Sequence, residues 1–246
     1  MSITTIINIS LLLILLFIAF KYAETFWSYK ISKPFLWERS IKEKLISKNL
    51  RSLEFQTRDK VRFYFMWFQI ERLKKENVPG SFAELGVYKG EWANIIFEMD
   101  RSRTLHLFDT FSGFDESDLK LEKTTGGKFN TKEFSDTSLE AVKKYINGGD
   151  NIIFHEGHFP GTARGLESET FAFVNIDADL YVPTREGLKF FYPRLSPGGV
   201  ILIHDYNHTW DGARKAIDEF VATIPESLVE LPDWQGSVMI VKNRLG

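Results

Sequence analysis

The pattern of hydrophobic and polar positions is clearest between residues 171 and 206. Two short apolar runs, at 171–176 and 200–203, each have the length of a buried strand. Between them, residues 183–195 place apolar side chains at helical spacing, and Ser-Pro-Gly-Gly at 196–199 is expected to stop the helix. Strand, helix and strand of these lengths predict a right-handed parallel unit, whose two strands end at the same edge of a sheet.

Acidic and histidine side chains follow both of these strands. Asp177 and Asp179 come after the first, and His204 and Asp205 come after the second. The carboxyl ends of parallel strands lie side by side, so these four residues are predicted to converge where open parallel sheets bind ligands. The aspartates after the first strand could simply cap the next helix. However, three carboxylates held close together are costly without a cation, which favours a functional role.

A second strand and helix begin at residue 81. Residues 82–87 form a short apolar run, Gly90 opens a helix that continues to residue 99, and the run 105–108 ends at Asp109. Glycines at a strand-to-helix turn allow a ligand to approach the backbone, and a carboxylate one strand further on suits a ribose diol. A tight turn without a ligand explains the glycines nearly as well. The position of Asp109 favours nucleoside binding.

The rest of the chain beyond residue 81 continues the alternation of helices and strands. Residues 112–136 form a long polar stretch that includes Thr124 to Gly127, and loops of this length are usually functional lids or disordered. His106 and His155 lie inside strands and are interpreted as structural, whereas His158 either lines a pocket or is a plain loop residue. The remaining predicted elements are a helix at 138–146, a strand at 152–155, a loop at 156–169, a helix at 211–224 and strands at 228–231 and 238–241.

The N-terminus differs from the rest of the chain. Residues 3–20 are nearly all aliphatic, with no charge before Lys21, and their length is at the low end of what spans a bilayer. We find neither a basic residue ahead of this run nor a small-residue cleavage site after it, as a cleaved signal peptide would need. We therefore expect an uncleaved membrane anchor over residues 1–21, with a buried core helix as the alternative.

The segment after the anchor is basic. Residues 21–75 contain fourteen Lys and Arg against six Asp and Glu, so the positive-inside rule places the catalytic domain in the cytoplasm, with this segment near anionic lipid. A solvated basic linker is the alternative. Residues 22–56 show no clean period, whereas 58–75 predict an amphipathic helix whose aromatic stripe, including Phe65 and Phe68, is expected to pack in a core. The predicted organisation is an anchor at 1–21, a helical neck at 22–78 and a catalytic domain at 79–246.

Composition narrows the classes of function. The 246 residues are 43% hydrophobic, which is enough for one well-packed domain with an appendage. The chain contains no cysteine, which excludes disulfides, thiolate zinc sites and cysteine nucleophiles. The net charge of -2 provides no general attraction to nucleic acid, so no nucleic-acid partner is expected.

Seven motifs follow one another along the chain: FAELGVYKGEWA, LFDTFSGFD, GHFPGT, DADLYVPTREGL, PRLSPGGVILIHDY, GARKAIDEF and LPDWQGSVMIVK. Together they resemble the macrocin O-methyltransferase family, metal-dependent enzymes that use S-adenosylmethionine to methylate sugars of antibiotics and polysaccharides. The resemblance covers roughly residues 79–242. It implies an α/β, Rossmann-like, seven-stranded and mostly parallel sheet with one antiparallel strand. It also implies S-adenosylmethionine as cofactor and a sugar-containing acceptor.

The resemblance also implies roles for individual residues. The cofactor's methionine end is expected to contact Glu84, Gly86 and Gly90, and its ribose is expected to contact Asp109. A divalent cation, most often magnesium, is expected on Asp177 and Asp205 with His204 beside them, and Asp179 stands where relatives are thought to have a general base. A sugar hydroxyl is a poor nucleophile at neutral pH, so a base on its proton or a cation on its oxygen is chemically reasonable.

One position departs from the family pattern. Relatives commonly read Asp-Asp-Tyr where this chain reads His204-Asp205-Tyr206. An imidazole in place of a carboxylate shifts metal preference from magnesium toward manganese, iron or zinc. Neighbouring strand residues point to opposite faces, although strand ends often escape that rule. His204 is therefore either a ligand or a residue beside the ligands, including a catalytic base.

Three functions remain open at this stage. The first is a membrane-tethered O-methyltransferase that acts on a sugar hydroxyl, with a lipid-linked or nucleotide-linked glycan precursor as one acceptor class. The second is a hydroxylase on the same fold, because Asp177, His204 and Asp205 resemble a two-carboxylate, one-histidine iron site. The third is a non-catalytic scaffold, against which the retained site residues argue. A homo-oligomer is left open.

Overall fold

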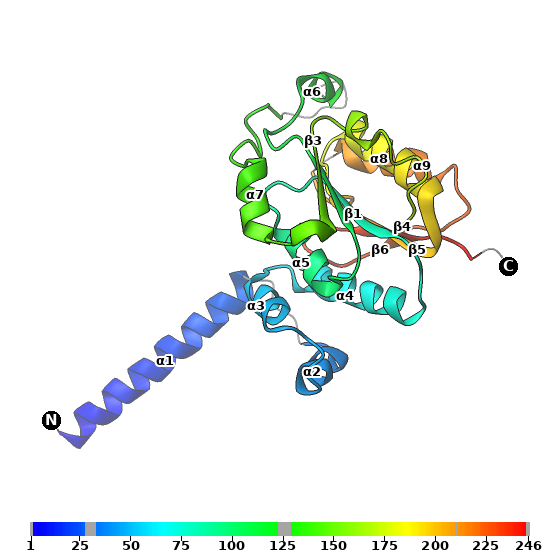
Figure 1. Cartoon of the computed structure of the whole chain (residues 1–246). Helices are drawn as coiled ribbons and strands as arrows, with labels where there is room; N and C mark the ends of the chain where they lie inside the picture. The colour runs from blue at the N-terminus through cyan, green and yellow to red at the C-terminus, as the bar shows by residue number, and fades with distance from the viewer. Residues whose placement is uncertain (1, 28–32, 123–128, 210, 245–246) are drawn as a thin grey trace. The chain divides into compact units, whose positions relative to one another are not determined.

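The computed structural model describes residues 2–27, 33–122, 129–209 and 211–244 (Figure 1). The chain divides into two compact units, Met1–Tyr64 and Phe65–Gly246. The division into anchor, neck and catalytic domain at residues 21 and 78 stays a prediction.

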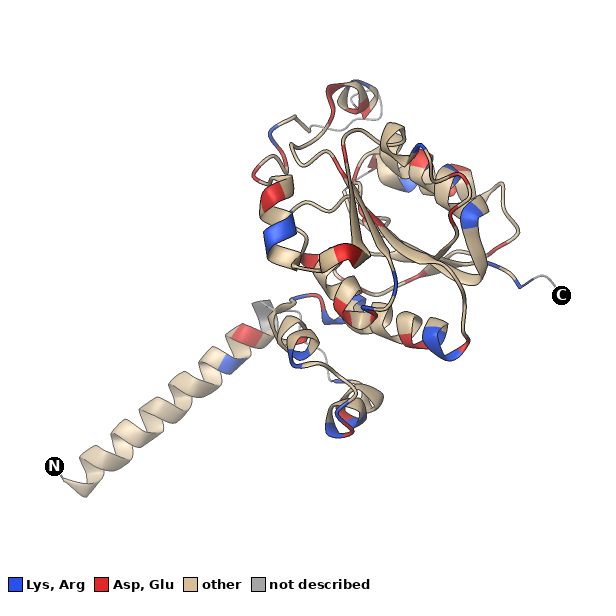
Figure 2. Cartoon of the chain, in the orientation of Figure 1, with Lys and Arg blue, Asp and Glu red and all other residues tan. Residues whose placement is uncertain are grey.

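The first unit begins with an exposed apolar helix, α1 (Ile3–Trp27). Its stretch Ile3–Thr25 is long and apolar enough to cross a membrane, and none of it is buried. At 1.5 Å per residue, 23 residues span about 34 Å, compared with about 30 Å for the hydrocarbon core of a bilayer. Figure 2 shows this helix almost free of charged residues. A signal sequence has the same length and composition, so these features fit an anchor and a signal alike.

Two short helices occupy the region where the sequence shows no period. They are α2 (Phe35–Lys42) and α3 (Lys48–Gln56), and each is shorter than the window over which a helical period becomes visible. The Ser47 hydroxyl starts α3 by accepting a hydrogen bond from the backbone N–H of Leu50 at 3.0 Å. The lack of a clean period over residues 22–56 therefore does not mean a lack of helices.

The helix α4 (Lys60–Lys75) confirms the helix predicted at 58–75 but shifts its buried face. Phe68 is 39% exposed and Phe65 only partly buried, contrary to expectation. The apolar residues that are buried on this helix are instead Phe63, Met66, Trp67, Ile70 and Leu73.

The second unit is built on a seven-stranded mixed sheet. Its strands lie in the order β3-β2-β1-β4-β5-β7-β6. The first five in sequence are parallel, and β7 pairs antiparallel with both β5 and β6, as expected from the resemblance. The strands are β1 (Ser81–Leu85), β2 (Leu105–Asp109), β3 (Ile152–Glu156), β4 (Phe171–Ile176), β5 (Leu195–Ile203), β6 (Val229–Glu230) and β7 (Val238–Val241).

The direction of the chain across the sheet reverses between β1 and β4. From β1, the helix α5 (Glu91–Met99) leads to β2 on one side, whereas from β4 the helix α8 (Tyr181–Arg194) leads to β5 on the other. Right-handed crossovers then place α5 and α8 on opposite faces of the sheet. The helix α7 (Leu139–Ile146) packs beside α5, and α9 (Asp211–Val221) packs beside α8 (Figure 1). The reversal point between β1 and β4 is where such sheets bind ligands.

Two predicted boundaries needed correction. The polar stretch 112–136 contains a helix, α6 (Glu116–Glu122), while Thr124 to Gly127 lie outside the described residues. Residues 196–199, expected as a helix stop, belong to β5, which begins at Leu195. The extra residues fit because the pairing register with β4 shifts between Phe171 and Phe173, so the irregularity is absorbed inside the sheet.

Candidate active site

The loop after β1 is shaped by glycine. Gly86 has a positive φ of 88°, and a Cβ at this position would overlap the carbonyl oxygen of Asp177. Gly90, with φ at 82°, precedes α5, and a Cβ there would lie 2.9 Å from Val142 Cγ1. Both glycines predicted as cofactor contacts are therefore required by the backbone and its close packing, and the ends of β1 and β4 touch through Gly86.

Asp109, predicted to bind ribose, holds the loop after β1 in place. Its Oδ2 accepts hydrogen bonds from the backbone N–H groups of Val87 at 2.6 Å and Tyr88 at 2.8 Å. Its Oδ1 accepts from the N–H of Phe111 at 2.7 Å. A carboxylate offers about four lone-pair positions, so one acceptor position is left for a ligand hydroxyl. The structural role of Asp109 is thus clear, and its contact with ribose stays a prediction.

Glu84 lies inside the sheet rather than on the loop. It is buried, and its Oε1 accepts a hydrogen bond from Asn175 Nδ2 at 2.7 Å. Asn175 is the residue paired with Glu84 across β1 and β4. The sequence interpretation missed Asn175, although it is the one polar residue in the run FAFVNI and that isolation was the available signal.

Three of the four predicted strand-end residues form a tight cluster. His204 Nδ1 lies 3.0 Å from Asp177 Oδ1 and 3.2 Å from Asp205 Oδ1. Among the described residues, these three form the group whose side chains could hold a metal ion, with one donor atom from each lying within 4.8 Å of the others. His204 and Asp205 are buried. The predicted convergence of Asp177, His204 and Asp205 is therefore present in the structure.

The backbone explains why His204 and its neighbour Asp205 share one face. Asp205 has φ of 64°, so it leaves the extended conformation in which neighbouring side chains alternate. Asp179 has φ of 58° in the loop after β4. Such left-handed conformations are uncommon outside glycine and concentrate at functional sites. Gln235, which the sequence interpretation missed, donates from Nε2 to Asp205 Oδ1 at 3.1 Å and helps to fix that carboxylate.

The chemistry of this cluster suits a divalent cation. Adjacent ligands of an octahedral ion with bonds of about 2.1 Å are about 3.0 Å apart, close to the spacings from His204 to the two carboxylates. Two carboxylates in a largely buried place also call for positive charge, which a cation or a protonated imidazole supplies. Asp179 follows Asp177 by two residues and stands outside the three-residue cluster.

Two tyrosines near the cluster in the sequence, and the candidate His158, have partners elsewhere. Tyr206 Oη donates to Asp218 at 2.7 Å, and this hydrogen bond, with burial, raises the pKa of Tyr206. Tyr181 Oη donates to Glu219 at 2.6 Å. His158 Nε2 lies 2.9 Å from Asp118 Oδ2 on α6, so it is tied to that helix.

Comparison with known proteins identifies the family. The family model described as macrocin-O-methyltransferase (TylF) matches residues 52–239. The chain is 31% identical to mycinamicin III 3''-O-methyltransferase of Micromonospora griseorubida over 183 residues, covering 68% of this chain and 70% of that protein. It is 27% identical to 8-demethyl-8-(2,3-dimethoxy-alpha-L-rhamnosyl)-tetracenomycin-C 4'-O-methyltransferase of Streptomyces olivaceus, spanning 61% of each.

Among solved structures, the O-methyltransferase NovP has the same fold, with a TM-score of 0.59 and 25% sequence identity. The alignment covers 75% of this chain and 81% of NovP. The family model matches well over half of the 246 residues, and the matched region contains the strand-end cluster and the loop after β1. The chain therefore belongs to the macrocin-O-methyltransferase (TylF) family and is an S-adenosylmethionine-dependent O-methyltransferase.

Proposed function

We propose that this enzyme transfers the methyl group of S-adenosylmethionine to a sugar hydroxyl of a glycosylated secondary metabolite or a related glycan precursor. The acceptor class is supported by the relatives, one of which is named for a rhamnosyl-tetracenomycin. The observation that carries the proposal is the position of the strand-end cluster. Asp177 follows directly after β4 and touches Gly86 of the loop after β1, at the point where the sheet order reverses.

The cofactor half of the site is assigned to the β1 and β2 ends. The methionine portion is assigned to the strand-to-helix turn around Gly86 and Gly90, because such turns face the ligand in sheets of this kind, and Asp109 offers its remaining acceptor position to a ribose hydroxyl. The buried Glu84, held by Asn175, provides negative charge beneath the loop, toward the cationic methionine end. The sulfonium of the cofactor supplies an activated methyl group. The protein's main task is therefore to orient the acceptor oxygen.

The acceptor half of the site is assigned to the strand-end cluster. Asp177, His204 and Asp205 would hold a divalent cation, which lowers the pKa of a hydroxyl bound to it. Asp179 is proposed as the base that accepts the hydroxyl proton, because it lies in the loop immediately after Asp177. With one nitrogen and two carboxylate donors, the cluster favours manganese or another transition ion more than an all-oxygen site would, although magnesium also fits two carboxylates.

The hydroxylase and scaffold alternatives are not retained, because the chain belongs to a family of O-methyltransferases. The donor set agrees with this: the iron sites of oxygenases have two histidines and one carboxylate, whereas this cluster has one histidine and two carboxylates.

We further propose that α1 anchors the enzyme in a membrane with its catalytic unit on the cytoplasmic side. The support is the 23-residue exposed apolar stretch and the excess of basic residues that follows it. A lipid-linked sugar would then be a natural acceptor, because enzyme and substrate would share one surface.

The test of the proposed chemistry is a calorimetric titration of S-adenosylmethionine into the full chain in detergent, with and without manganese. We expect micromolar binding. An Asp109→Ala variant should bind at least about tenfold more weakly, or ~1.4 kcal/mol, because three backbone N–H groups lose their acceptor. A folded protein without cofactor affinity would refute the proposal. The metal half is tested by titrating Mn²⁺ alone, and the absence of Mn²⁺ binding would refute it.

A further inference from the structure

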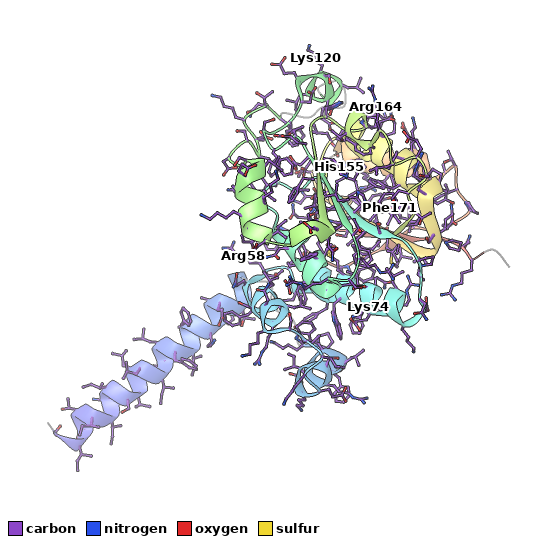
Figure 3. The ribbon with its side chains drawn as sticks, in the orientation of Figure 1. Arg58, Lys74, Lys120, His155, Arg164 and Phe171 are labelled. Atoms are coloured by element: carbon purple, nitrogen blue, oxygen red, sulfur yellow. The ribbon has the colours of Figure 1, made fainter. Side chains whose placement is uncertain are left out.

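The helix α6 buries an acidic face. Two of its three buried residues are Asp118 and Glu122, only 6% and 2% exposed. Lys120, labelled in Figure 3, is exposed on the same helix. Carboxylates are rarely buried without partners, because leaving water is costly for a charge. The partners of these two residues therefore indicate what holds α6 in place.

Glu122 caps a helix that lacks a cap of its own. Its Oε2 accepts a hydrogen bond from the backbone N–H of Tyr181, the first residue of α8, at 2.9 Å. The residue before the helix is Leu180, whose side chain cannot accept a hydrogen bond, and the first turn of α8 contains no acidic residue. The carboxylate that a helix N-terminus favours is thus supplied from 59 residues earlier in the chain.

The same carboxylate lies against the start of a second helix. Gly212 is the second residue of α9, and a Cβ at this position would overlap both carboxylate oxygens of Glu122. A side chain at position 212 would displace the carboxylate from its present place. Glu122 therefore lies at the N-terminal ends of α8 and α9 together, where both helices present partial positive charge.

We infer that Glu122 is a positioning residue for the loop that carries Asp177 and Asp179. This loop connects β4 to α8 and contains the left-handed Asp179, so its conformation must be held at both ends. At the β4 end, the N–H of Asp177 donates to the carbonyl of Leu85 at 2.8 Å. At the α8 end, the hydrogen bond from Tyr181 to Glu122 does the same. The inference rests on the roles proposed above for Asp177 and Asp179.

Asp118 offers a matched control. It lies one turn earlier on α6 and is similarly buried, but its partner is His158 Nε2, at 2.9 Å, in the segment after β3. Removing its charge should weaken the contact with His158 and leave the bond between Glu122 and Tyr181 in place. A difference between variants at 118 and 122 therefore separates the positioning of the loop from the general attachment of the helix.

The experiment compares Glu122→Ala, Glu122→Gln and Asp118→Asn with the unmodified full chain. Hydrogen exchange is measured over residues 177–184, and Mn²⁺ alone is titrated and followed by its electron paramagnetic resonance signal. For Glu122→Ala we expect exchange in this segment to rise about tenfold or more and Mn²⁺ affinity to fall several-fold. Glu122→Gln should recover part of both, because its amide oxygen still accepts a hydrogen bond without the charge. Asp118→Asn should leave both near the unmodified values.

Equal effects of the variants at 118 and 122, or unchanged exchange in Glu122→Ala, would overturn the inference. If Glu122→Ala does not fold, Glu122→Gln decides: unchanged exchange and Mn²⁺ affinity in that variant would reject the role. Failure of the unmodified chain to bind Mn²⁺ would count against the proposed metal site, whereas the exchange comparison would still decide the role of Glu122.

Discussion

His204 supplies the nitrogen donor of the strand-end cluster. Its Nδ1 lies about equally far from one oxygen of Asp177 and one of Asp205, so the imidazole occupies the middle of the cluster. A nitrogen donor at this point binds transition ions well and magnesium poorly, since magnesium prefers oxygen. In the proposed metal site, the choice of ion would therefore depend on this position.

Replacing His204 by aspartate should move metal preference back toward magnesium. We expect the ratio of Mg²⁺ to Mn²⁺ affinity to rise by about tenfold, ~1.4 kcal/mol, because a third carboxylate replaces the imidazole. Competition between the two ions in binding measurements gives this ratio. The control is His208→Asp, the same change at a nearby exposed histidine. An unchanged ratio in His204→Asp would mean that residue 204 is not a ligand.

At the scale of elements, sequence patterns predicted best where a short apolar run is buried on both faces of the sheet. The strands β4 and β7 have the predicted bounds because polar residues stop each run at both ends, and only Asn175 interrupts the run in β4. The helices α2, α3 and α6 were missed, since each has seven to nine residues and their buried positions include Ser40, Glu54, Asp118 and Glu122. Acidic residues buried through distant partners look like solvent-exposed ones in a sequence.

The same limit applies to the candidate site. Asp177, His204 and Asp205 could be predicted to converge because parallel strands share an edge. Asn175 stood out as the one polar residue in its run, but its hydrogen bond to Glu84 could not be predicted, because it depends on the pairing of two strands. The contact of Gln235 could not be predicted either, because it depends on the loop before β7. The left-handed backbone of Asp205, which turns its side chain toward His204, has no local signature in the sequence.

The pairing of β2 with β3 creates a pH-dependent element. His106 Nδ1 and His155 Nε2 lie 3.0 Å apart across these strands, and the His155 ring, labelled in Figure 3, stacks on Phe108 at 4.3 Å between ring centres. Burial, with the neighbouring His106, lowers the pKa of His155 to about 4. The folded chain thus favours the neutral ring of His155. The contribution of this neutral ring to the free energy of unfolding is complete above pH 6.5 and is lost as the pH falls toward 4.

We therefore expect the free energy of unfolding to decrease as the pH is lowered from 6.5 to 4. Its dependence on pH should be weaker in His155→Phe. The contribution should stay below about 1.4 kcal/mol per pH unit, because one proton is involved and the ring is only partly buried. Urea unfolding at several pH values measures it. The exposed His208→Phe is the control, and an identical slope in His155→Phe would contradict the assignment.

At the scale of the whole molecule, the proposed anchor can be tested because the chain contains no cysteine. A spin label on Leu12→Cys, in the middle of α1, should lie in hydrocarbon when the protein is placed in lipid nanodiscs. A label on the exposed Tyr145→Cys of α7 should remain in water. Accessibility to oxygen and to a water-soluble nickel complex distinguishes the two environments. A label at position 12 that is accessible to the nickel complex in water would contradict the proposal that α1 is a membrane anchor.

The contact between Gly86 and the carbonyl of Asp177 also constrains how this enzyme can be recombined with its relatives. The loop proposed for the cofactor and the loop that carries the acids meet backbone to backbone, with no side chain between them to absorb a mismatch. A chimera that took only one of these loops from another family member would place it against a loop with which it does not match. The two loops should therefore be exchanged together, although 91 positions separate Gly86 from Asp177 in the chain. Acceptor specificity is better redesigned in the segments outside these loops.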